Sequence, residues 1–286
     1  MSESEIAAGP NAAQSDYWNQ VAGPKWVRLA DSMDARLAPI LDLLLARAGT
    51  QPDEHVLDIG CGAGTSTLAL AGQVGASGRV VSIDISAPML TRARQRVADR
   101  ALTNISFLEA DAQTHNFGPD LFDRVVSRFG VMFFADPAAA FRNLRGAMRP
   151  GGRLCFVCWA PLADNPHWQI PLEIAARHLG PPTPQPPHAP GPMAFSDQAY
   201  LRGILEEAGF RNPRITMENV SLIGTTPEEE AALACVMGPT ARLIEERTPP
   251  EPVHEALRRE IAEAFRPFAG AEEMKLPAAV YAVSAE

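Results

Sequence analysis

The feature that most constrains the fold is a glycine-rich turn between an apolar run and a helical pattern, in VLDIGCGAGTSTLAL at residues 56–70. Residues 55–59 have the composition of a buried strand, and residues 65–74 have the apolar spacing of a helix. Glycines permit positive φ angles and let a ligand approach the backbone closely. Because open α/β sheets bind ligands where a strand ends and a helix begins, the turn predicts an α/β fold with a ligand at residues 60–64.

The same alternation of short apolar runs and helical patterns continues to residue 159. The runs are rich in Val and Ile and lack a clean polar alternation, which is typical of parallel strands covered on both faces. Strand–helix repeats of this kind form a doubly wound sheet with right-handed crossovers. The predicted strands are 79–84, 105–110, 122–128 and 153–159, and the predicted helices are 87–100 and 137–148.

The segments on either side of this core follow other patterns. Residues 12–48 are predicted to be helical, whereas GPPTPQPPHAPGP at 180–192 can form neither a regular helix nor a central strand. The remaining predictions are a capped helix at 196–210, helices interrupted by TPPEP at 226–270, and a terminal pair of strands at 214–224 and 278–286.

These patterns divide the chain into four parts. Residues 49–160 form the ligand-binding core, and residues 1–48 form a helical segment that covers its site. Residues 161–196 form a Pro-rich cap insert over the substrate. Residues 197–286 complete the core and carry a helical insert at 226–270.

The charge balance bears on the class of partner. The chain has 25 Lys and Arg residues against 34 Asp and Glu residues, a formal net charge of −9. Because affinity for nucleic acid depends on basic side chains that neutralise phosphates, we expect no nucleic-acid partner. No run approaches the ~18 uncharged apolar residues that a membrane span needs, and the first residues have no signal-peptide core.

The four cysteines do not predict a metal or redox site. Cys155 and Cys158 form a C-x-x-C pair, but positions three apart on a strand point to opposite faces. No second Cys/His pair completes a zinc site, so we expect no bound metal. Buried and reduced cysteines favour a cytoplasmic location.

Acidic residues follow three of the predicted strands. Asp84 ends the second strand, 20 residues after Gly64, where a carboxylate can accept hydrogen bonds from both ribose hydroxyls. Asp111 follows the third strand and can accept from an exocyclic amine while the Ala112 N–H donates to a ring nitrogen. Asp58 precedes the turn and can oppose a cationic amino-acid group. One such Asp is often only a turn former, but three beside a glycine-rich turn predict a nucleoside site.

These segments resemble the five ordered motifs of class I S-adenosylmethionine-dependent methyltransferases. The motifs are VLDIGCGAGTSTLAL, VVSIDISAPML, ISFLEADAQ, FDRVVSRFGVMFF and LRGAMRPGGRLCFV, over roughly residues 50–160. The chain is similar to the ubiquinone/menaquinone-biosynthesis type of small-molecule methyltransferase. The resemblance implies a Rossmann-like seven-stranded sheet whose last strand is antiparallel. It also implies S-adenosyl-L-methionine as cofactor, S-adenosyl-L-homocysteine as product, and in-line methyl transfer to a small aromatic or apolar acceptor.

The resemblance also implies which residues hold the methionine part of the cofactor. By motif position these are Asp58 and the backbone of Gly60, Cys61 and Gly62. Ser127, at the end of the fourth strand, would contact the methionine amine through its backbone.

The nucleoside part is assigned in the same way. Asp84 would hold the ribose, with Ile85 and Met89 packed near the adenine. Asp111 and Ala112 would recognise the adenine edge.

An aromatic side chain from the N-terminal segment is a further candidate. Tyr17, Trp18 or Trp26 could cover the sulfonium, because an aromatic face attracts a cation. Aromatic residues at helical spacing are more often packing residues, so both interpretations stay open; Trp26 is the residue we assign to the site.

Other reaction classes fit the sequence less well. A nicotinamide dinucleotide fingerprint requires Gly or Ala where this chain has Thr65, and its only lysines, Lys25 and Lys275, form no Tyr-x-x-x-Lys pair. A non-catalytic S-adenosylmethionine-binding protein would share the same core. A methyltransferase for RNA or protein is less consistent with the acidic charge balance and the cap-like inserts, which favour a small acceptor.

The acceptor side of the site is the least defined by sequence. PLADNPHWQIP follows the fifth strand on the ligand-binding edge, where His167 could act as a base beside Trp168; a surface-loop histidine packed by Trp168 is the alternative. Arg128 could anchor an acidic or carbonyl group, or pair with Asp123 or Asp136. The acceptor, the methylated atom and a homodimeric assembly stay open.

Overall fold

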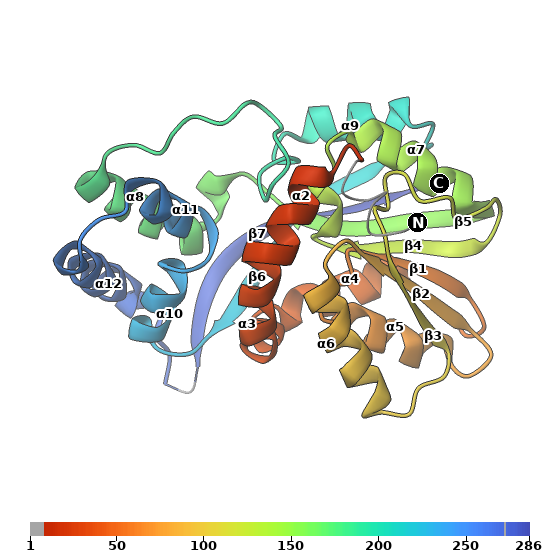
Figure 1. Ribbon diagram of the computed structural model, residues 1–286, viewed down its shortest axis with the longest axis horizontal. Helices are drawn as coiled ribbons and strands as arrows, with labels where there is room; N and C mark the ends of the chain where they lie inside the picture. The colour runs from red at the N-terminus through yellow and green to blue at the C-terminus, as the bar shows by residue number, and fades with distance from the viewer. Residues whose placement is uncertain (1–8, 272) are drawn as a thin grey trace.

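A seven-stranded mixed sheet organises the computed structural model, which describes residues 9–271 and 273–286 (Figure 1). The strand order is β3-β2-β1-β4-β5-β7-β6. The first five strands run parallel, and β7 is antiparallel to both β5 and β6. The strands are β1 (His55–Ile59), β2 (Arg79–Asp84), β3 (Ile105–Glu109), β4 (Phe122–Arg128), β5 (Met148–Trp159), β6 (Arg214–Gly224) and β7 (Met274–Ala285). The predicted fold, including the antiparallel last strand, is confirmed.

Helices cover both faces of the sheet, as the continuous apolar runs predict. In Figure 1 one layer lies below the sheet and the other above it. The central strand residues Val80, Val125 and Phe156 are fully buried between these layers, which is why the runs lack polar alternation. The first layer consists of α4 (Ala38–Ala48), α5 (Thr65–Val74) and α6 (Ala87–Ala98), and the second of α7 (Pro137–Ala147) and α9 (Gln198–Glu207).

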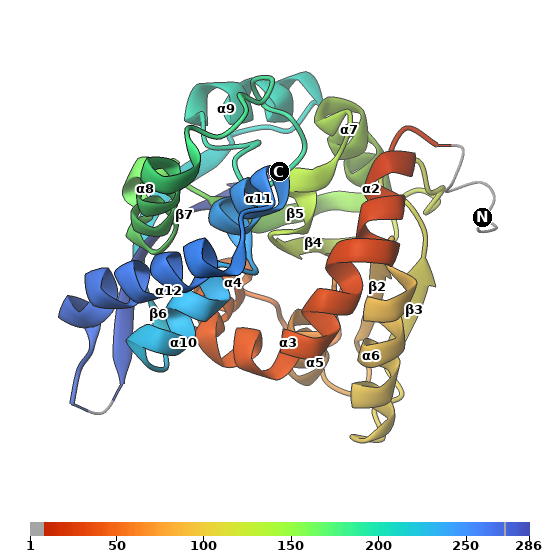
Figure 2. The same cartoon turned by 60° about the vertical axis from the view of Figure 1, so that its left-hand side comes forward.

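The N-terminal segment lies along the edge where the parallel strands end. It consists of α2 (Ala12–Tyr17), the π-helical turn η1 (Trp18–Ala22) and α3 (Gly23–Arg36), as the helical prediction for residues 12–48 requires. Figure 2 shows it passing beside α6. At Gly23 a Cβ would lie 2.1 Å from the Trp18 carbonyl oxygen and 2.5 Å from Ser86 Oγ. Only glycine therefore allows this close approach to the start of α6.

A second group of helices gathers beside β6 and β7, on the left of Figure 1. It consists of α8 (Pro166–Leu179), α10 (Pro227–Ala234), α11 (Gly238–Arg247) and α12 (Glu251–Phe265). The predicted helices of residues 226–270 and the break at TPPEP are confirmed, and residues 180–192 contain no helix. We call these four helices the helical lobe.

Helix α8 lies inside the Pro-rich insert at residues 161–196, in a part for which the sequence predicted no secondary structure. Pro166 occupies the first turn, where the missing N–H would have had no partner. Pro171 lies inside the helix and is buried, so packing in the lobe stabilises a helix that this proline disfavours. Ile174 and Ala175 supply the buried face.

Two further observations bear on the sequence analysis. Cys155 and Cys158 are free and buried on β5, as predicted from their spacing. Among the residues that the structure describes, no helix is both long enough and apolar enough to cross a membrane.

Candidate cofactor site

The glycine-rich turn joins β1 to α5 through three residues with positive φ angles. Gly60, Gly62 and Gly64 have φ angles of +63°, +57° and +85°. A Cβ at Gly60 would lie 2.6 Å from Gly130 Cα, in the turn that follows β4. The Gly60 and Cys61 N–H groups donate to the Ile83 carbonyl at 2.8 and 3.2 Å, which ties the turn to the end of β2. The conformation therefore requires glycine and brings the ends of three strands together.

Asp84 lies at the end of β2, directly against this turn. Its Oδ2 accepts from the Gly62 N–H at 2.7 Å, and its Oδ1 accepts from the Ser86 N–H at 2.9 Å. Burial raises the pKa of Asp84, although these backbone donors lower it. A carboxylate can accept about four hydrogen bonds, so the fixed group still has lone pairs for two ribose hydroxyls.

Asp58 is fully buried near the end of β1, and only one of its two carboxylate oxygens has hydrogen-bond partners among the described residues. Ser66 Oγ and Thr67 Oγ1 both donate to Oδ2 at 2.8 Å, whereas Oδ1 has no partner among the described residues. Burial raises the pKa of Asp58 to about 6, although the two hydroxyls lower it. Because an unpartnered buried carboxylate oxygen is unfavourable, this position fits a cationic group such as an ammonium.

Asp111 follows β3 and belongs to a buried polar network. Its two carboxylate oxygens accept from Asn11 Nδ2 at 3.0 and 2.9 Å, and Oδ1 also accepts from the Gln113 N–H at 2.8 Å. Asn11 Oδ1 in turn accepts from the Ala135 N–H at 2.7 Å. Neither Asn11 nor Gln113 was singled out by the sequence analysis, since an isolated amide side chain carries no recognisable pattern. The network places the N-terminal segment beside the predicted adenine edge.

Ser127 and Arg128 end β4 beside the turn. Ser127 Oγ donates to the Ile59 carbonyl at 2.8 Å and accepts from the Gly130 N–H at 3.1 Å, so it holds the ends of β1 and β4 together. Arg128 pairs with Asp34 of α3 at 3.5 Å.

Neither acid that the sequence suggested for Arg128 is its partner. Asp123 pairs instead with Arg149 at 2.6 Å, and Asp136 accepts from the Ala139 N–H as the N-cap of α7. Both acids already have these local partners, whereas Asp34 comes from a helix far away in the sequence.

The aromatic residues of the N-terminal segment lie in different environments. Trp26 is half-buried and packs against a small apolar cluster that includes Ala63 of the turn and Met89 of α6. Trp18 meets Phe133 edge-on at 5.2 Å, and Tyr17 is 46% exposed. Of the three, Trp26 is the one that packs against the cluster containing a residue of the glycine-rich turn.

The remaining candidate contacts on the nucleoside side also lie near the turn. The Ile85 carbonyl accepts from Asn19 Nδ2 at 3.0 Å, so the N-terminal segment also attaches directly after Asp84. A Cβ at Gly62 would lie 3.0 Å from Met89 Cε, so the Met89 side chain lies against the turn. Ala112 is buried beside Asp111.

His167 is the second residue of α8, the helix that follows the carboxyl end of β5. Its side chain is 4% exposed, and neither ring nitrogen has a hydrogen-bond partner among the described residues. Trp159 and Trp168 lie against it, with ring centroids at 5.2 and 4.9 Å. Burial, together with the positive charge of Arg36, lowers the pKa of the imidazole to about 3. His167 is therefore not a surface-loop residue, and it is a weak base at neutral pH.

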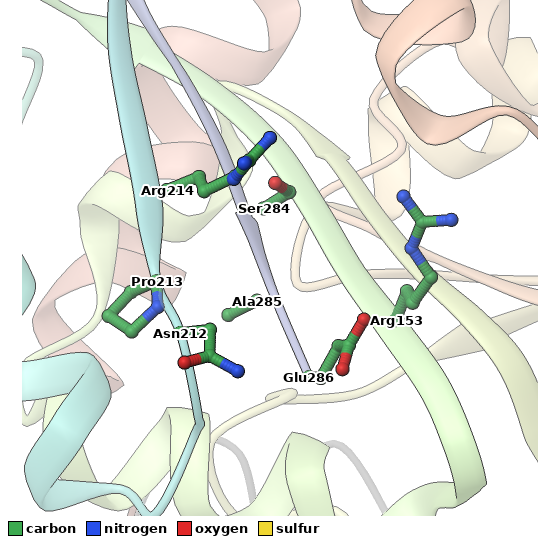
Figure 3. Close-up of a pocket in the computed structure, with 7 residues that line it drawn as sticks. All are labelled: Arg153, Asn212, Pro213, Arg214, Ser284, Ala285 and Glu286. Carbon is green, nitrogen blue, oxygen red and sulfur yellow. The ribbon is translucent and has the colours of Figure 1, made fainter.

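A surface cavity of about 560 Å³ lies at the opposite edge of the sheet (Figure 3). Arg153, Arg214 and Ser284 line it, near the starts of β5 and β6 and the end of β7. The glycine-rich turn and the three acids lie instead at the carboxyl ends of β1, β2 and β3, so this cavity is not the candidate cofactor site. Within the described part of the chain, no three His, Cys, Asp or Glu side chains gather as a metal site.

The residues at the carboxyl edge fit S-adenosylmethionine. The glycine turn permits close approach to the backbone, Asp84 has free lone pairs, and the unpartnered Asp58 Oδ1 fits a cationic group. Asp58, Gly60, Gly62 and Asp84 are brought together, and Asp111 lies one strand further on, after β3.

Comparison with known proteins agrees with this geometry. A family model described as a methyltransferase domain matches residues 56–152. The aklanonic acid methyltransferase DauC of a Streptomyces strain is 39% identical over 103 residues, which cover 36% of this chain and 47% of that protein. Uncharacterized mycobacterial proteins are matched over 43% of their length, so the chain spans less than half of these relatives.

The match to the ubiquinone/menaquinone biosynthesis C-methyltransferase UbiE of Proteus mirabilis is longer. The two are 30% identical over 173 residues, 57% of this chain and 68% of that protein. A solved S-adenosylmethionine-dependent methyltransferase from Aquifex aeolicus has the same fold, with a TM-score of 0.51, 22% identity, and coverage of 70% of this chain and 92% of that one. The motifs, the sheet topology and these matches lead to one conclusion: the chain belongs to the class I S-adenosylmethionine-dependent methyltransferases.

Proposed function

We propose that the chain transfers a methyl group from S-adenosylmethionine to a small aromatic or apolar acceptor and releases S-adenosylhomocysteine. The observation that carries the proposal is the arrangement of Asp58, Asp84 and Asp111 at the ends of three adjacent strands around the glycine turn. Their places match an ammonium, a ribose and an adenine in that order. Thr65 stands where the fingerprint of a nicotinamide dinucleotide requires Gly or Ala, which disfavours that cofactor.

The protein groups in this proposal bind and orient rather than react. The cofactor, when bound, supplies a methyl group on a cationic sulfur, which is already activated for displacement. Asp58 and the backbone of Gly60, Cys61 and Gly62 hold the methionine part, and the Ser127 backbone lies beside its amine. Asp84 holds the ribose, while Asp111 and Ala112 hold the adenine beside Ile85 and Met89. Alignment of the acceptor and exclusion of water then supply most of the catalysis.

The acceptor is proposed to lie between the cofactor site and the helical lobe. Phe129 directly follows β4 and has a φ angle of +68°, a conformation that bulky residues rarely adopt. Its ring stacks on Trp159, the last residue of β5, with centroids 4.4 Å apart and planes at 9°. Backbone strain of this kind clusters at functional sites, and the aromatic pair beside it offers apolar surface to an acceptor.

The domain division belongs to the same proposal. Residues 1–48 cover the cofactor, and the insert at 161–196 with the helices of 226–270 covers the acceptor. Trp26 packs near the turn on the cofactor side. Names of two relatives, an aklanonic acid methyltransferase and a ubiquinone/menaquinone biosynthesis C-methyltransferase, support the choice of a small acceptor over RNA or protein.

His167 enters this proposal as a hydrogen-bonding group on the acceptor side. Neither of its nitrogens makes a hydrogen bond of good geometry within the described chain, although the nearby Pro277 backbone partly offsets the fall in its pKa, and the aromatic rings of Trp159 and Trp168 flank it. With a pKa of about 3 it stays neutral at pH 7, so it can orient an acceptor hydroxyl or carbonyl better than it can remove a proton.

Two measurements test the function. Calorimetry should detect S-adenosylhomocysteine binding and no NAD binding to the purified protein. Methyl transfer from labelled S-adenosylmethionine to a panel of small phenols, quinols and amines should then yield a methylated product. Binding without any product over a broad panel would favour the non-catalytic alternative, and NAD binding would overturn the cofactor assignment.

A further inference from the structure

Arg128 is a largely buried cation without a full set of partners among the described residues. Its side chain is 14% exposed, and its Nη1 has no hydrogen-bond partner in that part of the chain. Its one ion pair within the described chain, from Nη2 to Asp34 Oδ1, is long at 3.5 Å. Burial lowers the pKa of Arg128, as expected for a cation that its surroundings stabilise poorly.

Asp34 cannot neutralise Arg128 by itself, because it already has stronger partners. Its Oδ1 accepts from Thr65 Oγ1 at 2.6 Å, and its Oδ2 pairs with Arg96 Nη1 at 2.8 Å. One carboxylate is thus shared by a hydroxyl and two guanidinium groups. A buried guanidinium in this position is expected to bind a further anion, since an unpaired buried charge is costly.

A buried group of opposite sign close by is Asp58, and one of its oxygens also lacks a partner in the part of the chain that the structure describes. Asp58 and Arg128 end the neighbouring strands β1 and β4 and influence each other electrostatically. No ion pair between them is present within 4.0 Å in the described structure, although direct pairing would satisfy both. Two unsatisfied groups of opposite charge, held apart, match a ligand that carries both charges.

The start of α5 adds a second favourable place for an anion. Its N-cap is Gly64, which has no side chain to accept from the first N–H groups of the helix. Thr65, the first helical residue, contacts Asp34 and so lies near the Arg128 guanidinium. Free N–H groups and the helix dipole favour a carboxylate here.

We infer that Arg128 binds the α-carboxylate of the amino-acid part of S-adenosylmethionine, while Asp58 Oδ1 accepts from its α-ammonium. The inference rests on the proposed function, and it assigns Arg128 to the cofactor rather than to the acceptor. It makes Arg128 the residue that distinguishes a nucleoside with an amino-acid tail from one without it.

Two ligands separate this role from a structural one. S-adenosylhomocysteine carries the amino-acid tail, and 5′-methylthioadenosine keeps the nucleoside and sulfur but lacks it. Binding of both is measured by calorimetry for the wild type, Arg128→Met and Arg128→Lys. We expect Arg128→Met to weaken S-adenosylhomocysteine binding at least about tenfold, as for loss of a charge-assisted hydrogen bond. Its affinity for 5′-methylthioadenosine should change less than about twofold, and Arg128→Lys should recover part of the loss.

The matched control is Arg124→Met, which removes another buried, ion-paired arginine of the same strand, bonded to Glu54 at 2.8 Å. It should leave the preference for S-adenosylhomocysteine unchanged. Equal weakening of both ligands by Arg128→Met would show a structural role and overturn the inference, as would unchanged binding of both. Wild-type protein that binds neither ligand would instead overturn the proposed function on which the inference depends.

Discussion

At the scale of single residues, the acids of the site differ in how well the protein itself satisfies them. Asp84 receives two backbone N–H bonds, and Asp58 receives two hydroxyl bonds on one oxygen and none on the other from the residues that the structure describes. Asp84 is therefore held rigidly with lone pairs to spare. Asp58 depends on a ligand to satisfy its second oxygen, so its titration should be coupled to binding.

The substitution Asp84→Asn tests the ribose assignment. Both carboxylate oxygens of Asp84 accept a backbone N–H, and the proposal gives them ribose hydroxyls as further donors. The amide of the variant places an N–H donor at one of these two positions, where it faces another donor. We expect the Kd for S-adenosylhomocysteine to rise at least about tenfold, since hydrogen bonds to charged groups contribute about 1.5–3 kcal/mol. Calorimetry measures the effect, and the exposed Asp99→Asn on the same βα unit serves as control. Unchanged affinity in Asp84→Asn would remove the acid from the site.

The pH dependence of binding follows from Asp58. Burial raises its pKa to about 6, so below pH 6 the carboxyl is mostly protonated and attracts an ammonium weakly. Between pH 7 and pH 5 we expect the affinity for S-adenosylhomocysteine to fall by about tenfold, because each pH unit below the pKa reduces the ionised fraction about tenfold. Calorimetry in two buffers should detect proton release on binding near pH 6. The Asp58→Asn variant should bind weakly at every pH, and a flat profile in the wild type would contradict the assignment.

At the scale of elements, the N-terminal segment attaches to the site by side-chain hydrogen bonds. The Asn11 side chain donates to Asp111 and Gln113 and accepts from the Ala135 N–H. The Asn19 side chain donates to the Ile85 carbonyl and accepts from the Ala87 N–H. Asn11 and Asp111 are both buried. These hydrogen bonds therefore attach the first part of the segment, residues 11–19, beside the predicted adenine position.

Removal of the Asn11 contacts should loosen the segment without unfolding the core. In Asn11→Ala, Asp111 loses its side-chain donor and the Ala135 N–H loses its acceptor, at a cost of about 1–3 kcal/mol. Hydrogen exchange followed by mass spectrometry should become faster across residues 9–22 and stay unchanged in β1 and β4. Faster exchange throughout the sheet would instead indicate that Asn11 supports the whole fold.

The observed helices and strands show which parts of the fold and of the site could be predicted from the sequence. Strands β1, β2 and β4 and helix α5 have the predicted bounds, because buried parallel strands and a glycine turn leave strong local patterns. Helix α8 was missed because Pro171 opposes a helix that packing against the rest of the lobe and β7 stabilises. Asn11 and the Asp34 partner of Arg128 were missed because they reach the site through tertiary contacts, which no local spacing records.

At the scale of the whole molecule, one buried ion pair joins parts of the chain that are far apart in sequence. Arg36 at the end of α3 pairs with Glu230 of α10, and both side chains are less than 10% exposed. The pair connects the N-terminal segment to the helical lobe, and the charge of Arg36 also reaches His167. It therefore lies where the segment that covers the cofactor meets the lobe proposed to cover the acceptor.

Loss of one partner should destabilise the molecule far more than loss of both. Glu230→Ala leaves the Arg36 charge buried and unpaired, which costs about 3–5 kcal/mol in comparable cases. The double variant Arg36→Met with Glu230→Met replaces the pair by apolar side chains and should recover most of that free energy of unfolding. Urea unfolding measures each variant.

An exposed pair between the same segment and the same lobe provides the matched control. Lys25 of α3 pairs with Glu245 of α11 at 3.2 Å, and the Glu245 side chain is 58% exposed. Glu245→Ala should change the free energy of unfolding by no more than about 1 kcal/mol, as for other surface pairs. If Glu230→Ala were as mild as Glu245→Ala, water would have to reach Arg36 in solution, and the contact between segment and lobe would not be closed.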